Sequence, residues 1–160
     1  MVEARFDAAK MLNRIDLDDP GTVRMLETSG RAVTELARAG VVAMLEPFLS
    51  RRVDGRVTND LSPDAVIRSV HIAQGLGATS AYTWLKLPVV AEMERVMDAT
   101  TLPTLLLGGD PSRRPEETYA SWRAALALPS VRGLVLGRTM LYPGDDDVAS
   151  AVDTAVSMVR

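Results

Sequence analysis

Apolar and polar positions along this chain follow two alternating patterns. Short apolar runs rich in Val, Leu and Met, typical of buried strands, are separated by longer stretches with the three-to-four-residue period of amphipathic helices. The short runs predict strands at 8–15, 41–48, 80–87, 103–107 and 133–136. The longer stretches predict helices at about 20–39, 63–76, 89–99, 116–128 and 145–159. The order therefore indicates five consecutive β/α units.

The segment between the second predicted strand and the second predicted helix is polar. Residues 49–61 contain the turn signal Asp54-Gly55 and three arginines, Arg51, Arg52 and Arg56, and they predict a long loop. These arginines could steer an anionic substrate, although a solvated surface is the commoner role of such residues.

Near-continuous apolar strands between amphipathic helices predict a parallel sheet covered by helices, joined by right-handed crossovers. Two architectures satisfy this pattern. A five-stranded doubly wound, flavodoxin-like sheet fits the length of 160 residues. A (β/α)8 barrel needs eight strands, so five units form a partial barrel with two unpaired edges, unless the chain is a fragment or pairs with another copy. Both architectures place functional sites at the carboxyl ends of the strands, within a single domain spanning residues 1–160.

Composition narrows the chemistry that the chain can perform. A hydrophobic content of 47% can form a core, and a formal charge of -3 gives no reason to expect nucleic acid or an anionic membrane as a partner. The absence of cysteine excludes disulfides and thiolate sites, and one histidine cannot form a histidine-rich metal site. We therefore expect neither a metal nor a cofactor. No apolar run has membrane-spanning length and no signal core follows Met1, so we expect a cytoplasmic protein.

Lysine is rare in this chain, which otherwise uses arginine as its cation. Only Lys10 and Lys86 occur, both in predicted strands. A primary amine can form an imine with a carbonyl compound, which a guanidinium cannot do. Because side chains alternate along a strand, Tyr82, Trp84 and Lys86 share one face, with Lys86 last. Partial burial beside apolar neighbours would leave more of the neutral amine that attacks a carbonyl. The alternative is a long side chain that merely passes its apolar neighbours.

Other polar groups are predicted at the carboxyl ends of neighbouring strands. Glu46 shares a face with Met44 and Phe48, one strand from Lys86, where it could transfer protons or form a buried ion pair. At the end of the first strand, Arg14 and Asp16 are candidates for substrate binding.

Two glycine-bearing turns directly follow the last two predicted strands. Gly108-Gly109 follows the fourth strand and Gly137-Arg138 follows the fifth. Their backbone amides and the Arg138 guanidinium could bind a phosphate, because consecutive strand-end loops form such sites in barrels. Taken singly, each glycine pair more often reflects the needs of a turn.

Five short segments together resemble the second half of the class I, lysine-dependent sugar-phosphate aldolases. They are similar to the tagatose-bisphosphate, archaeal-type fructose-bisphosphate and deoxyribose-phosphate aldolase-like barrels. The segments are Ala9-Lys10-Met11-Leu12, Met44-Leu45-Glu46, Trp84-Leu85-Lys86-Leu87-Pro88-Val89, Leu105-Leu106-Leu107-Gly108-Gly109 and Gly133-Leu134-Val135-Leu136-Gly137-Arg138.

The resemblance implies a role for each matching residue. Lys86 would form the Schiff base, Glu46 and Lys10 would assist proton transfer, and Gly109 and Arg138 would bind phosphate. The implied activity is a carbon-carbon lyase of carbohydrate metabolism that acts on a small phosphorylated sugar, aldehyde or ketone, and we expect a homo-oligomer.

The sequence also departs from this family's pattern. The resemblance begins at the fourth strand of the family barrel, so the first three units, including the strand that carries a catalytic aspartate, have no counterpart. Phe48 stands where archaeal-type members tend to have tyrosine. The alternative function is a non-catalytic truncated barrel or a phosphate-binding regulatory domain. For such a phosphoacceptor, Asp16, Asp18 and Asp19 only loosely supply the acidic cluster.

Overall fold

The computed structural model describes residues 5–108 and 114–159. Within these ranges five parallel strands alternate with helices, in the sheet order β1-β2-β4-β5-β6, and β3 pairs antiparallel with β2. The elements are β1 (Ala8–Ile15), α1 (Gly21–Arg38), β2 (Val42–Val53), β3 (Arg56–Asn59), α2 (Pro63–Gln74), β4 (Thr83–Leu87), α3 (Met93–Asp98), β5 (Thr104–Leu107), α4 (Pro115–Leu126), β6 (Val131–Val135), α5 (Arg138–Leu141) and α6 (Val148–Met158).

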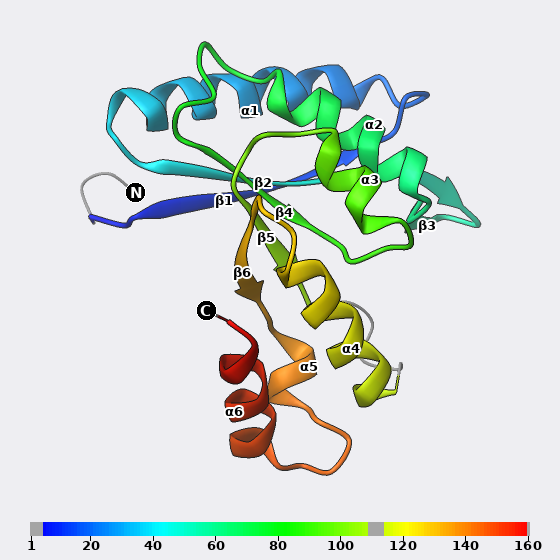
Figure 1. Ribbon diagram of the computed structural model, residues 1–160. Coiled ribbons are helices and arrows are strands. Elements are labelled where there is room, and N and C mark those ends of the chain that lie inside the picture. Colours follow the sequence, from blue (N-terminus) through cyan, green and yellow to red (C-terminus); the bar gives the residue numbers. More distant parts are fainter. Residues whose placement is uncertain (1–4, 109–113, 160) are drawn as a thin grey trace.

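The strand order distinguishes between the two predicted architectures. Each parallel strand lies beside the next parallel strand in the sequence, so the strand order runs one way across the sheet and never turns back. A doubly wound sheet has such a reversal, whereas a barrel does not, and in a barrel all the helices lie on one face. The prediction of five barrel-type units is confirmed, and the flavodoxin-like alternative is wrong. In Figure 1, helices α1, α2 and α3 lie in the upper part of the molecule, beside the first strands of the sheet. Helices α4, α5 and α6 lie in the lower part, near β6.

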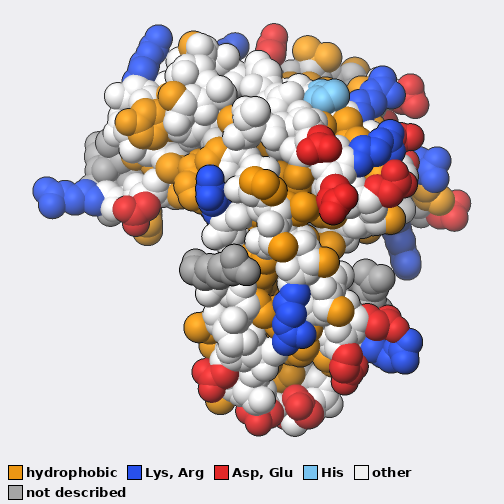
Figure 2. Space-filling model, in the orientation of Figure 1, with side chains coloured by type: hydrophobic (Ala, Val, Ile, Leu, Met, Phe, Trp, Pro, Cys, Tyr) orange, Lys and Arg blue, Asp and Glu red, His pale blue; other side chains and the backbone are white. Residues whose placement is uncertain are grey.

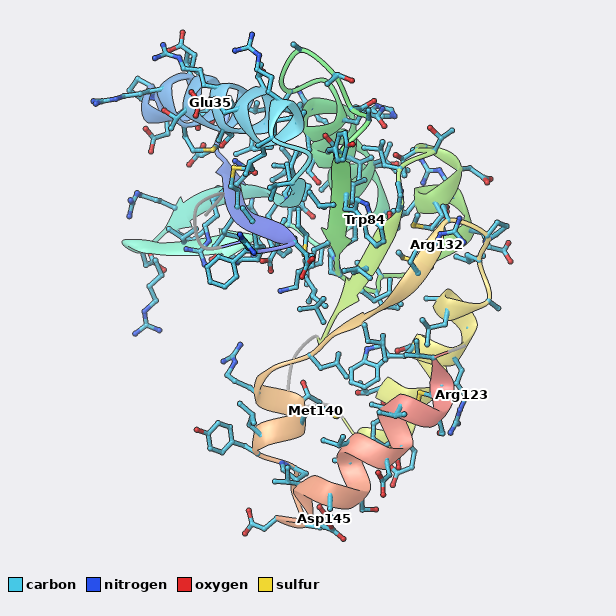
Figure 3. The ribbon with its side chains drawn as sticks, turned by 90° about the vertical axis from the view of Figure 1, so that its left-hand side faces the viewer. Glu35, Trp84, Arg123, Arg132, Met140 and Asp145 are labelled. Atoms are coloured by element: carbon cyan, nitrogen blue, oxygen red, sulfur yellow. The ribbon has the colours of Figure 1, made fainter. Side chains whose placement is uncertain are left out.

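The main core lies between the sheet and its first three helices. Leu45 of β2 and Leu85 of β4 are fully buried there together with Val33 of α1, Val70 of α2 and Val96 of α3. A smaller core joins the last three helices, where Trp122 of α4 packs with Met140 of α5 and with Ala151 and Ala155 of α6. In Figure 3, α5 with Met140 lies beside α6, and α4 passes behind α6.

The opposite face of the sheet, called here the inner face, is open at β1. Along this strand Ala9, Asn13 and Ile15 are buried toward the helices, whereas Lys10 and Arg14 alternate with them and are exposed. This is the period of two expected for a strand with one covered face. Hence the inner face of β1 presents Lys10, Leu12 and Arg14 to solvent.

The predicted loop at 49–61 is instead a hairpin, which corrects the sequence-based expectation. β2 continues to Val53, turns at Asp54-Gly55 and returns as β3. Both turn residues have positive φ, 50° and 76°, as a two-residue hairpin turn requires. The exposed arginines of this segment hid its strand character, because neither face of the hairpin is buried in the core.

The loop before β4 is held against α1 by a close backbone approach at Gly77. This residue has φ +80°, and a Cβ there would lie 2.6 Å from Cγ1 of Val33. The next amide, Ala78 N, donates a hydrogen bond of 3.0 Å to Oγ1 of Thr34. Only glycine fits this position, so the loop enters β4 from a fixed point on α1.

Candidate active site

Three charged side chains from adjacent strands meet on the inner face. The Glu46 carboxylate on β2 lies 2.8 Å from Lys10 Nζ on β1 and 3.4 Å from Lys86 Nζ on β4, both measured to Oε2. The strand register explains this meeting, because Glu46 lies opposite Leu12, two residues beyond Lys10 on the same face of β1. One carboxylate oxygen thus bridges the only two lysines of the chain.

Burial differs within this cluster. The side chains of Lys86 and Glu46 are 14% and 12% exposed, whereas that of Lys10 is 44% exposed. Water therefore screens the Lys10 end of the bridge more strongly than the Lys86 end. The structure brings together the three residues that we predicted as catalytic, although this arrangement also suits a structural ion pair.

The two candidates at the end of β1 have different surroundings. Arg14 is exposed and lies in register with Phe48, and in the ranges that the structure describes it forms no ion pair. Asp16 belongs to the turn into α1. Its Oδ1 accepts a bond of 3.1 Å from Asp18 N, and its carbonyl oxygen accepts one of 2.6 Å from Thr22 Oγ1. Asp16 therefore shapes this turn, whatever else it contacts.

The glycine-bearing turns after β5 and β6 lie side by side. Thr139 Oγ1 donates a hydrogen bond of 3.1 Å to the carbonyl oxygen of Gly108, and a Cβ on Gly108 would lie 3.8 Å from Gly137 N. Arg138 is exposed at the start of α5. Gly109, the other predicted phosphate-binding glycine, lies outside the described residues. Thr139 was not predicted from the sequence, although its position directly after Gly137-Arg138 was an available signal.

Two charged groups that lie away from the Lys10, Glu46 and Lys86 cluster have shifted pKa values. Hydrogen bonds from Ser62 lower the pKa of Asp60 below its ordinary value. The backbone amide of Ser62 has the larger effect and its hydroxyl the smaller one. A hydrogen bond with Asp64 raises the pKa of Arg95. In the described parts of the chain, no group of three or more His, Cys, Asp or Glu residues is placed to hold a metal ion. Those parts also contain no helix with the length and apolarity needed to cross a membrane.

Comparison with solved structures relates this fold to aldolase barrels. A Schiff-base-forming fructose-1,6-bisphosphate aldolase matches with a TM-score of 0.77 at 18% identity, and an archaeal fructose-1,6-bisphosphate aldolase matches with 0.77 at 16%. Each match covers 99% of this chain and 60% of the aldolase chain. At this identity the likeness shows the fold alone: the five units correspond to part of an aldolase TIM barrel.

Comparison by sequence gives a more specific result. The search of curated proteins returned no match. The crystal structure of Cgl0159 from Corynebacterium glutamicum is 60% identical to this chain, with a TM-score of 0.96 over 99% of it. The match covers 53% of the Cgl0159 chain, so the present chain spans about half the length of that relative. Residues 1–156 match the model of the Cgl0159-like family. The chain therefore belongs to the Cgl0159-like family.

Proposed function

We propose that this chain carries the imine-forming site of a class I aldolase-like lyase, which cleaves or forms a carbon-carbon bond in a small phosphorylated sugar. The observation that carries the proposal is the bridge from Glu46 to both lysines across three adjacent strands, with Lys86 next to the carboxyl end of β4. Barrel enzymes place their catalytic groups at these strand ends. The fold shared with Schiff-base aldolases supports the same proposal.

Lys86 is the nucleophile in this proposal. Its side chain is 14% exposed, so it is accessible to a small carbonyl compound yet mostly shielded from water. The amine adds to the carbonyl carbon, and loss of water gives an iminium ion. That ion accepts the electron pair of the breaking carbon-carbon bond, while the hydroxyl on the leaving carbon gives its proton to Glu46 and becomes the carbonyl of the aldehyde. The released aldehyde then leaves, and protonation of the enamine followed by hydrolysis returns the free lysine.

Glu46 and Lys10 transfer protons in these steps. Glu46 lies 3.4 Å from Lys86 Nζ, within reach to take the proton that the amine must lose before it attacks. The carboxylate also lies 2.8 Å from Lys10 Nζ, which can give a proton to the departing hydroxyl during iminium formation or, in the bond-forming direction, to the alkoxide of the product. The greater exposure of Lys10 allows it to exchange protons with solvent.

The glycine-bearing turns supply a phosphate site at a distance from Lys86 that suits a short sugar phosphate. Lys86 pairs in register with Leu105, and Gly108 follows three residues later, about 10 Å further along the strand direction. Gly108 and Gly137 with Arg138 then hold the phosphate while the carbonyl carbon lies at Lys86. This spacing favours a short phosphorylated sugar over a large substrate.

Borohydride trapping tests the imine directly. The chain, alone and joined to the unmatched part of Cgl0159, is incubated with phosphorylated ketoses and aldehydes, reduced with borohydride, digested and examined by mass spectrometry. We expect a reduced adduct on the peptide that contains Lys86 and on no other. The Lys86→Arg variant keeps the positive charge but cannot form an imine, so its adduct should disappear.

Lys10→Arg is the matched control, because it keeps a cation beside Glu46. This variant should still be trapped at Lys86, but more slowly, because an arginine stays protonated near neutral pH and cannot donate its proton to the substrate. An adduct that persists in Lys86→Arg, or no adduct with either form of wild type, would contradict the imine mechanism. The second result would favour a non-catalytic barrel segment in which Glu46 serves only as an ion-pair partner.

A further inference from the structure

Helix α6 exposes a stripe of valines along one flank. Val148, Val152, Val156 and Val159, the last being the residue after the helix, are 40%, 41%, 65% and 40% exposed. Their spacing of three and four residues places them on one side of the helix. Ala151 and Ala155 pack instead toward Trp122 in the small core. Figure 2 shows apolar side chains on this lower part of the molecule, with acidic groups at its base.

The valine stripe leads to an open edge of the sheet. Cγ1 of Val159 lies 3.9 Å from the position of a Cβ on Gly133 of β6, so the end of the stripe reaches that strand. In the described chain β6 pairs only with β5, and at the opposite end β1 pairs only with β2. Unpaired edges next to exposed apolar side chains are unfavourable in an isolated sheet.

The packing of the other helices indicates what would cover this surface. Helix α1 packs against β1 and β2, and α2 packs against β2 and β4, so each covers its own strand and the following one. Helix α6 follows β6, the last strand described, so by the same pattern we expect its free flank to face a following strand. A second copy would bring the total to ten strands, whereas a barrel of this type closes with eight.

We propose that the valine stripe of α6 and the free edges of β6 and β1 form a docking surface for three further β/α units. The occupant is a polypeptide of the kind found in the part of Cgl0159 that this chain does not match. Its two outer strands pair with β6 and β1, and its helices cover the valines. Docking also closes the inner face over the Lys10 side chain, which is 44% exposed here.

A binding experiment tests this surface without reference to activity. The probe is the unmatched part of Corynebacterium glutamicum Cgl0159, made as a separate polypeptide and titrated against this chain, with the mass of the complex measured by light scattering. We expect a 1:1 complex. Hydrogen exchange should slow at the amides of residues 131–135, where the edge of β6 becomes paired.

Two arginine substitutions on α6 test the role of the valine stripe. Val152→Arg should weaken the complex at least tenfold. Ser157→Arg, on an exposed position away from the stripe, should leave the affinity within twofold of wild type. Both sites are exposed in the chain alone, so circular dichroism should show both variants folded.

If the probe alone is insoluble, it is joined to the chain through a protease site and the linker is cut after purification. The two parts should then stay together. Separation of the cut parts, or equal effects of the two substitutions, would overturn the proposal. A homodimer of the chain that Val152→Arg dissociates would assign the surface to a second copy instead.

Discussion

Substitution of Gly77 by alanine tests how tightly the loop before β4 is held on α1. A Cβ at this position would lie 2.6 Å from Cγ1 and 2.9 Å from Cβ of Val33, which is 1% exposed and cannot move into solvent. The backbone φ of +80° adds strain for any residue with a side chain. Gly77→Ala therefore combines a conformational penalty with overpacking of the core.

The two contributions can be separated within this chain. Alanine in a left-handed conformation costs about 1–2 kcal/mol, and overpacking a well-filled core costs about 1–3 kcal/mol more. Gly55 has a similar φ of +76°, but no heavy atom lies within 4 Å of the position of its Cβ. Gly55→Ala should therefore show only the conformational penalty, so Gly77→Ala should lower the free energy of unfolding by about 2–5 kcal/mol and Gly55→Ala by about 1–2 kcal/mol.

Urea unfolding followed by circular dichroism measures both free energies under the same conditions. In a Val33→Ala background, which removes the closest methyl group, the cost of Gly77→Ala should fall but stay above that of Gly55→Ala, because Cβ of residue 33, 2.9 Å away, remains. Equal destabilisation by the two glycine substitutions in wild type would refute the close packing of Gly77 against Val33.

Two further substitutions test the electrostatics of the chain. Glu46→Gln leaves the Lys86 ammonium, 14% exposed, without its carboxylate and should lower the free energy of unfolding by about 2–3 kcal/mol. Lys10→Met, at the 44% exposed end of the bridge, should cost less than about 1 kcal/mol; equal losses would show that burial does not separate the two pairs. The Ser62 amide and hydroxyl lower the pKa of Asp60 in the folded state, so this carboxylate stabilises the fold above its unfolded-state pKa, and the contribution is lost as the pH falls through its folded-state pKa. Because Asp60 is solvent-screened, Asp60→Ala should cost less than about 1 kcal/mol at pH 7 and still less at pH 3, and an equal cost at both pH values would contradict the assignment.

Strand positions and their faces were predictable because burial on one side imposes a period of two. That period placed Lys86 on the same strand face as Trp84, and Glu46 on the same strand face as Met44. It could not show that Lys10 and Lys86 share one oxygen of Glu46, since that depends on the register between strands separated by long helical crossovers. Register is a tertiary property, set by packing of α1 and α2 on the sheet.

Elements without a buried face were not predictable in the same way. The hairpin of β2 and β3 lies outside the main core, so its polar sequence resembled a loop, although Asp54-Gly55 gave its turn. Helix α5 has only four residues, too few to show a helical period. The contact between Thr139 and Gly108 depends on this short helix, so it was missed as well.

The ion-pair bridge also has a consequence for how the sheet can form. If β1 slipped by one residue against β2, every side chain of β1 would change faces, and Lys10 would point into the apolar layer beneath α1. Such a slip would separate its ammonium from Glu46 and bury an unpaired charge. An edge strand of this length could otherwise pair in several alignments. A single lysine on β1 thus penalises a slip of one residue as well as stabilising the native alignment.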